Sequence, residues 1–157
     1  MSLNPKLFSA AYKQANKSDE VDCMSPEEAA PLLDWIRARL ANPELLNLLA
    51  EFPLSGDEQL CAHYFFGLRA IKESTESSRL LAEKYLVVGS AANGDYIVIP
   101  FGNPLEVGFV NHETLDDVRG ICEYVCVSHD LGEFYYNSWN QNGFPGDYYE
   151  AIRTRDA

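Results

Sequence analysis

The sequence predicts an α+β fold, in which an antiparallel β-meander of four to six strands is flanked by helices. Three β-rich runs follow one another between residues 85 and 110, and two turns separate them. The first turn is Asn93-Gly94, a pair that readily adopts the positive φ angles of a tight hairpin. The second is Gly102-Asn103-Pro104. Helical patterns lie outside this meander, and helices segregated from consecutive antiparallel strands are typical of α+β domains.

The length and composition predict one domain over residues 1–157. The chain has 157 residues, of which 46% are hydrophobic and 12% aromatic, enough for a single core. Within this domain we expect N-terminal helices over 4–52, followed by the sheet and the C-terminal helices over 60–153. No internal repeat or linker divides the chain.

Three helices are expected before the sheet. Asn4-Pro5 starts a helix over 5–15, with asparagine as N-cap and proline in the first turn. Ser25-Pro26-Glu27-Glu28 has the form of a capping box and begins a helix that continues to about Leu40. A third helix runs from Pro43 to about Glu51.

The other elements follow from their apolar periodicity and their turns. The aromatic run over 60–66 favours a strand, and Glu76–Arg79 forms an i,i+3 pair on the solvated face of the next helix. In chain order these elements are a strand over 60–66, a helix over 70–84, meander strands 86–88, 96–99 and 105–110, a strand over 121–127, a helix capped by Ser128, and a last helix over 144–152.

The charge of the chain limits its partners. The formal net charge is −12, from 24 acidic and 12 basic residues. Such a field repels phosphate backbones and anionic lipid, so nucleic-acid and membrane-surface binding are disfavoured. It attracts a basic protein instead. The ordinary alternative is that the acidity only keeps the protein in solution.

Eight of the carboxylates fall between residues 95 and 133, against one basic residue, Arg119. An acidic face of this kind can meet a basic partner and speed association, or it can be the solvated rim of the sheet. No Asp-x-Asp-x-Asp-Gly loop for calcium is present. The acidic candidates for partner binding are Asp95, Glu106, Glu113, Asp116 and Asp117.

Six aromatic residues lie within fifteen positions near the C-terminus. Aromatic residues at helical spacing are usually core, but tyrosine and tryptophan also anchor protein interfaces. We therefore add Tyr135, Tyr136 and Trp139 to the candidate partner-binding residues. A homodimer joined through these aromatics is the alternative.

Metal and phosphate sites are not expected, and the sequence implies no cofactor. Cys122 and Cys126 precede His129, but residues four apart on a strand sit about 13 Å apart, too far to share one zinc ion. The glycine-containing stretch 89–94 lacks the Lys-Ser/Thr ending of a phosphate loop and leads into a strand rather than a helix.

Catalysis is not expected either, although one alternative stays open. No local signature supports a nucleophilic Cys–His pair. Of the three histidines, His112 is the best candidate for function, because it lies in an acidic loop after the third meander strand. The alternative is therefore a small hydrolase that uses His112 with nearby carboxylates.

The expected location is the cytoplasm. No run of about 18 apolar residues predicts a membrane span, and the N-terminal residues lack the basic-then-apolar order of a secretory signal. Four cysteines in a chain of this length are no disulfide framework, so we expect reduced thiols.

The segment from Tyr64 to Trp139, about half the chain, resembles the SUKH superfamily, which includes the fungal cell-wall assembly regulator and many bacterial immunity proteins. The resemblance is carried by three motifs: Val87-Val88-Gly89-Ser90-Ala91-Ala92-Asn93-Gly94-Asp95, then Glu106-Val107-Gly108-Phe109, then Ser128-His129-Asp130-Leu131-Gly132-Glu133-Phe134. It implies a SUKH-like domain without catalysis. Many bacterial members neutralise toxins, several of which are nucleases, and a basic nuclease suits an acidic inhibitor.

The sequence as a whole thus predicts a non-catalytic intracellular protein-binding module. The resemblance makes an immunity protein for a basic toxin, such as a nuclease, the first hypothesis. The small hydrolase that uses His112 and a structural homo-oligomer are the alternatives.

Overall fold

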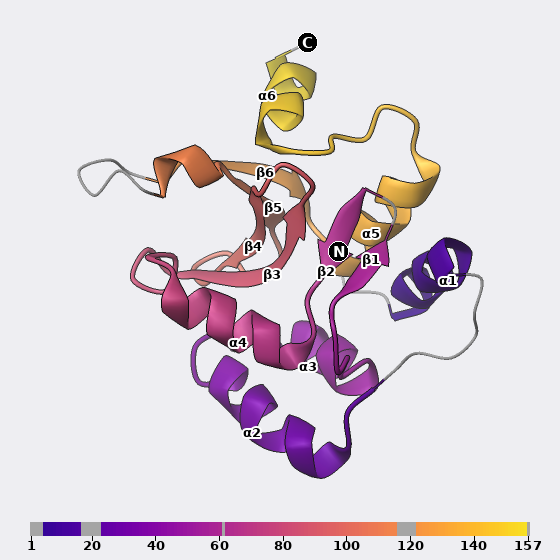
Figure 1. Ribbon diagram of the computed structural model, residues 1–157, viewed down its shortest axis with the longest axis vertical. Helices are drawn as coiled ribbons and strands as arrows, with labels where there is room; N and C mark the ends of the chain where they lie inside the picture. Colours follow the sequence, from indigo (N-terminus) through magenta and orange to yellow (C-terminus); the bar gives the residue numbers. More distant parts are fainter. Residues whose placement is uncertain (1–4, 17–22, 61, 116–121, 157) are drawn as a thin grey trace.

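The protein is described from a computed structural model that covers residues 5–16, 23–60, 62–115 and 122–156. Within these residues the chain forms six α-helices, one 3-10 helix and a six-stranded sheet (Figure 1). The strands lie in sequence order and every neighbouring pair is antiparallel. The predicted α+β class with an antiparallel meander is confirmed.

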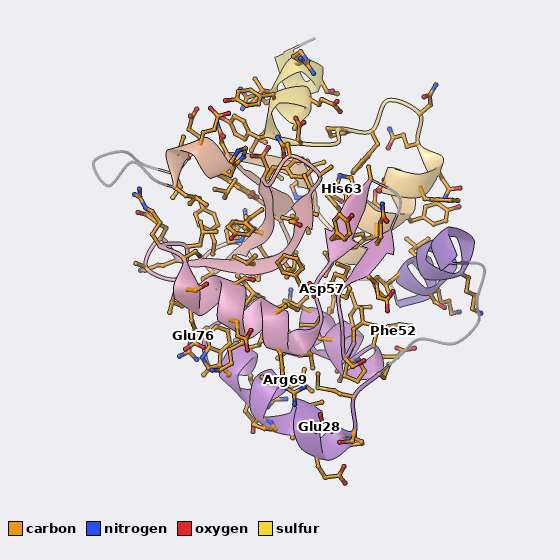
Figure 2. The ribbon with its side chains drawn as sticks, in the orientation of Figure 1. Glu28, Phe52, Asp57, His63, Arg69 and Glu76 are labelled. Atoms are coloured by element: carbon orange, nitrogen blue, oxygen red, sulfur yellow. The ribbon has the colours of Figure 1, made fainter. Side chains whose placement is uncertain are left out.

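Three helices precede the sheet, as predicted: α1 (Pro5–Asn16), α2 (Pro26–Arg37) and α3 (Pro43–Glu51). The Oγ of Ser25 accepts a hydrogen bond from the Glu28 N–H at 3.3 Å and caps α2. The side chain of Glu28 forms an ion pair with Arg69 of α4 (Leu68–Ser77), 3.1 Å away (Figure 2). Glu28 therefore joins two helices as well as lying in the first turn of its own.

The strands are β1 (Glu58–Leu60), β2 (His63–Phe65), β3 (Tyr85–Ala91), β4 (Tyr96–Pro100), β5 (Val107–Val110) and β6 (Tyr124–Ser128). The single strand predicted over 60–66 is wrong, because that region contributes to two short paired strands. The predicted strand over 121–127 is displaced toward the C-terminus, and its first residue lies outside the described part of the chain.

The β3–β4 hairpin requires glycine at two positions. Gly94 has a φ of +98° in the turn, a conformation that side chains with a Cβ rarely adopt. Gly89 lies where β2 and helix α5 (Leu131–Asn140) approach β3. A Cβ at this position would overlap the carbonyl oxygen of Tyr64 and sit 2.7 Å from the Tyr135 hydroxyl. The glycines thus fix the turn and allow the close approach of the neighbouring elements.

The sheet separates two apolar clusters. Because successive strand residues point to opposite faces, Ile97 and Ile99 of β4 enter the main core while Val98 enters a smaller cluster. Helix α4 (Leu68–Ser77) packs beside β3. It is shorter than the predicted helix over 70–84, and the predicted Glu76–Arg79 pair is wrong: Glu76 pairs with Lys72, and Arg79 pairs with Glu83.

The C-terminal region contains the 3-10 helix η1 (His112–Thr114), α5 (Leu131–Asn140) and α6 (Tyr148–Asp156). Ser128 was expected to cap α5, but Asp130 does so, because its Oδ1 accepts a hydrogen bond from the Glu133 N–H at 3.0 Å. Ser128 ends β6 instead. None of the described helices combines the length and the apolar character needed to cross a bilayer.

Candidate protein-binding surface

The carboxylate of Asp95 joins three separate segments of the chain. It accepts hydrogen bonds from the His112 N–H at 3.0 Å, from the Tyr148 N–H at 2.9 Å and from the Asn93 amide at 2.9 Å. Its Oδ1 also lies 2.6 Å from the Nδ1 of His112. The β3–β4 turn, η1 and the first residue of α6 are therefore fixed to one another through a single side chain.

The environment of Asp95 favours its charged form. Burial alone would raise the pKa of a carboxyl group with no exposed surface, but the hydrogen bonds from His112, Tyr148 and Asn93 outweigh it and lower the pKa. The buried carboxylate is thus ionised near neutral pH. Asp95 was expected to touch a partner, yet it is 0% exposed and positions the surrounding elements instead.

Three tyrosine hydroxyls hold three glutamates, and two of these tyrosines are the first residues of α6. Hydrogen bonds run from Tyr124 to Glu106 at 3.0 Å, from Tyr148 to Glu123 at 3.2 Å, and from Tyr149 to Glu113 at 3.2 Å. We call these six residues the tyrosine–glutamate set. Within the described part of the chain, no lysine or arginine forms an ion pair with any of the three glutamates.

Burial keeps Tyr124 and Tyr148 of this set protonated. It is the largest cause that raises the pKa of Tyr124 and of Tyr148, and the neighbouring glutamates raise both values further. A protonated phenol donates its hydrogen bond to the carboxylate, which orients the carboxylate without neutralising it. The set therefore presents negative charge in a defined geometry.

The acidic residues predicted from the sequence are only partly brought together. Glu106 and Glu113 belong to the tyrosine–glutamate set, and Glu113 is exposed. Asp116 and Asp117 lie outside the described residues.

The predicted aromatic residues divide into core and surface. Tyr135 has no exposed area, and its ring packs against Phe8 and Phe65. This burial removes Tyr135 from the candidate surface. Tyr136 is half-buried, whereas Trp139 is 41% exposed.

Sequence reasoning missed four members of the set as candidates: Glu123, Tyr124, Tyr148 and Tyr149. Tyr148 reaches the site because its main-chain N–H binds Asp95, a residue 53 positions earlier. A main-chain contact of that range leaves no local pattern. The acidic cluster around Glu123 and the paired aromatics at the start of α6 were the available signals.

Cys122 and Cys126 lack the lowered pKa of a reactive thiolate. Burial is the largest cause that raises the pKa of both Cys122 and Cys126, so neither is activated as a thiolate. Among the residues that the structure describes, no three histidine, cysteine, aspartate or glutamate side chains are placed to hold a metal ion.

Comparison of the chain with protein families, with curated proteins and with solved structures finds no match in any of the three. The SUKH resemblance therefore stays a prediction from the sequence motifs.

Proposed function

We propose that the protein is a non-catalytic module that binds and neutralises a basic protein, acting in the cytoplasm as an immunity protein does toward a toxin. The observation that carries this proposal is the tyrosine–glutamate set. Its three carboxylates are oriented by hydroxyl groups, and in the described part of the chain no cation pairs with them. A partner can supply the missing positive charge.

Electrostatics supports a basic partner. A net charge of −12 attracts a cationic protein over distance and raises its association rate at low salt. Carboxylates that are already oriented lose little side-chain entropy on binding. Tyr149 and Trp139, which are 44% and 41% exposed, are amphipathic anchors of the kind that dominate binding energy.

A nuclease toxin is the partner class that fits this chemistry best. An enzyme that binds a phosphate backbone needs a cationic surface, and an acidic protein can cover that surface. The SUKH resemblance of the β3–β4 hairpin supports the same assignment, since bacterial members of that superfamily include immunity proteins.

The proposal is tested by co-expression with basic, growth-inhibiting proteins encoded beside its gene. We expect one of them to be neutralised and bound, with an affinity that falls as salt rises. The triple variant E106Q/E113Q/E123Q should weaken this complex at least tenfold, while the remote triple variant E28Q/E73Q/E76Q should change it less than twofold. If no neighbouring product is bound, or if both triple variants bind equally well, the proposal is wrong.

A second candidate function is hydrolysis with His112 as general base. The observation in its favour is the buried Asp95 carboxylate 2.6 Å from Nδ1, which can orient the imidazole as a third group orients a catalytic base. His112 does not line the hollow between α5 and α6 or those beside α1 and α3. Turnover of small chromogenic esters that disappears in H112A would support this candidate, whereas equal rates for H112A and the wild type would exclude it.

A further inference from the structure

A groove lies between α5 and α6, and its lining includes Cys126, whose side chain neighbours Tyr124 and Glu106. Its volume is about 480 Å³, within the range of specific ligand sites. Residues 126–128 of β6 line it, together with one face of α5 and part of α6. Phe144 and Pro145, from the connection between the two helices, add apolar surface. The groove therefore combines a strand with two helical walls.

The strand in this groove has an unpaired edge. Among the strands that the structure describes, β6 is the last of the sheet and β5 is its one neighbour. The Asn111 N–H donates to the Glu123 carbonyl at 2.9 Å, and the register then opposes Tyr124 to Val110 and Cys126 to Gly108. Because bonded and non-bonded pairs alternate in antiparallel sheets, the backbone N–H and C=O of Cys126 point away from β5. Both groups are therefore directed to the outer edge of β6, on the side opposite β5.

One wall of the groove carries unused polar side chains. Glu133, Asn137 and Gln141 all line it. The first two are at i and i+4 on α5, a spacing that places side chains on one helix face, and Gln141 is the C-cap residue that follows the helix. Among the described residues, none donates to or accepts from these three side chains. A carboxylate and two amides together offer acceptors and donors along the length of the groove.

We infer that this groove binds an extended, basic segment of the protein partner, which adds to β6 as an additional antiparallel or parallel strand. Unpaired strand edges are templates for such addition. The amides of Asn137 and Gln141 would bind the outer backbone edge of the segment, and a lysine or arginine would pair with Glu133. The inference relies on the proposed function only in taking a protein as the ligand.

The charges and the shape of the groove identify this occupant. Glu133 is the acidic side chain of the lining, whereas Arg155 already has an interaction within the protein. A second copy of the chain is a poor occupant, because its own β6 is recessed between α5 and α6 in the same way. A single extended segment can enter where a folded sheet edge cannot.

The test uses the full ¹⁵N-labelled chain and an acetylated, amidated heptapeptide of alternating lysine and valine. We expect saturable shifts of the Tyr124 and Cys126 backbone amides and of the Asn137 and Gln141 side-chain amides. Two further peptides carry N-methyl groups on the valines or on the lysines, which removes the donors from one edge of the extended segment. The peptide that lacks the donors facing β6 should bind at least tenfold more weakly than the parent peptide, and the peptide that lacks the outer donors, which face the Asn137 and Gln141 amides, should lose less.

Protein variants supply the second arm of the test. E133K should weaken binding of the lysine–valine peptide at least fivefold. E73K makes the same charge change at an exposed position of α4, and should alter binding less than twofold. Dispersed amide spectra of both variants show that each is folded.

Three results would overturn the inference: no shifts at millimolar peptide, equal binding of all three peptides, or Tyr124 shifts that follow protein concentration without peptide, which indicate self-association. Different results would disprove the proposed immunity function and the proposed peptide binding at β6. If the peptide binds at β6 but no toxin is neutralised, the immunity function is disproved and the binding groove is supported. If a toxin is neutralised but no peptide binds, only the proposal for the groove is disproved.

Discussion

The acidic side chains have different partners at the two ends of the molecule. At the end formed by α2 and α4, glutamates pair with cations: Arg69 lies 3.1 Å from Glu28, and Lys72 lies 2.6 Å from Glu76 (Figure 2). Helix α6 lies at the opposite end of the molecule from α2 (Figure 1). There, Glu123 and Glu113 accept hydrogen bonds from Tyr148 and Tyr149. Residues 1–84 contain 13 acidic and 9 basic side chains, whereas residues 85–157 contain 11 and 3.

This difference separates a solvated surface from a surface suited to a partner. Exposed ion pairs contribute little to stability, about 0–1 kcal/mol each, and they leave little net field. Glutamates held by neutral hydroxyls keep their charge, so the field of the chain is concentrated at the α6 end.

Removal of the Asp95 carboxylate should have the largest effect on stability. D95A leaves buried N–H donors of His112 and Tyr148 unpaired, and we expect a loss of about 3–5 kcal/mol in the free energy of unfolding. D34A, at the exposed end of an α2 ion pair, should cost less than about 0.5 kcal/mol. Urea unfolding measures both, and similar losses would contradict the contrast.

The stability that Asp95 contributes should depend on pH, which gives a second test of its role. Because its pKa is lower in the folded than in the unfolded chain, its stabilisation is complete above the ordinary value of 3.8 and is lost as the pH falls through the folded value. D95A should lack this acid-dependent component. A D95A variant with the same acid profile as the wild type would contradict the assignment.

Acidification should also destabilise the protein through His63. The ring is 1% exposed and packs against Phe134, its Nδ1 lies 2.8 Å from the Ser138 hydroxyl, and its Nε2 has no partner among the described residues. Burial lowers its pKa from 6.5 to about 4, although the nearby backbone of Pro145 and Gly146 opposes this in part.

As the pH falls, His63 is therefore protonated in the unfolded chain at a higher pH than in the folded protein. Stability from this group is complete above pH 6.5 and falls by about 3 kcal/mol as the pH drops to about 4. Urea unfolding at pH 7 and pH 4.5 should show a smaller difference for H63F than for the wild type. The exposed His129 serves as control, since H129A should leave the difference unchanged.

Neutralisation of the two sets of glutamates should have opposite effects on stability. E28Q/E76Q/E83Q removes three ion pairs and should lower the free energy of unfolding by about 1 kcal/mol in low salt. E106Q/E113Q/E123Q keeps an acceptor for each tyrosine and relieves like-charge repulsion, so stability should stay within about 0.5 kcal/mol or rise. A larger loss in the second variant would show that these charges are structural.

The smallest effect is expected for Y149F. The hydroxyl of Tyr149 contacts Glu113 at 3.2 Å and Asn111 at 3.2 Å, but the side chain is 44% exposed. We expect a loss of about 0.5 kcal/mol in thermal or urea unfolding, because water replaces both contacts. A loss above 2 kcal/mol would mean that Tyr149 belongs to the core rather than to the surface.

Local signals in the sequence predicted the elements well, and long-range contacts explain what they missed. Asn93-Gly94 and Ser25-Pro26 identified a hairpin and a helix start, because both depend on adjacent residues. The same local reasoning placed Asp95 at the surface. Asp95 is buried because α6 packs against it through the main-chain N–H of Tyr148. Every residue except proline has such an N–H, so no sequence pattern predicts this contact.

The prediction that Tyr135 belongs to a binding surface was wrong for a related reason. Tyr135 and Trp139 are four positions apart on α5, yet the first is wholly buried and the second is 41% exposed. What separates them is the neighbouring structure: Phe8 of α1 and Phe65 of β2 enclose Tyr135. Neither neighbour is close to α5 in the sequence.

The attachment of α6 through a main-chain group has a consequence for how this protein can diversify. Asp95 binds the N–H of Tyr148 rather than a side chain, so the anchor persists whichever non-proline residue stands there. Side chains farther along α6, such as Thr154 and Arg155, line the groove. Related chains can therefore change the wall that a partner meets while the helix stays docked, which separates the evolution of specificity from the maintenance of the fold.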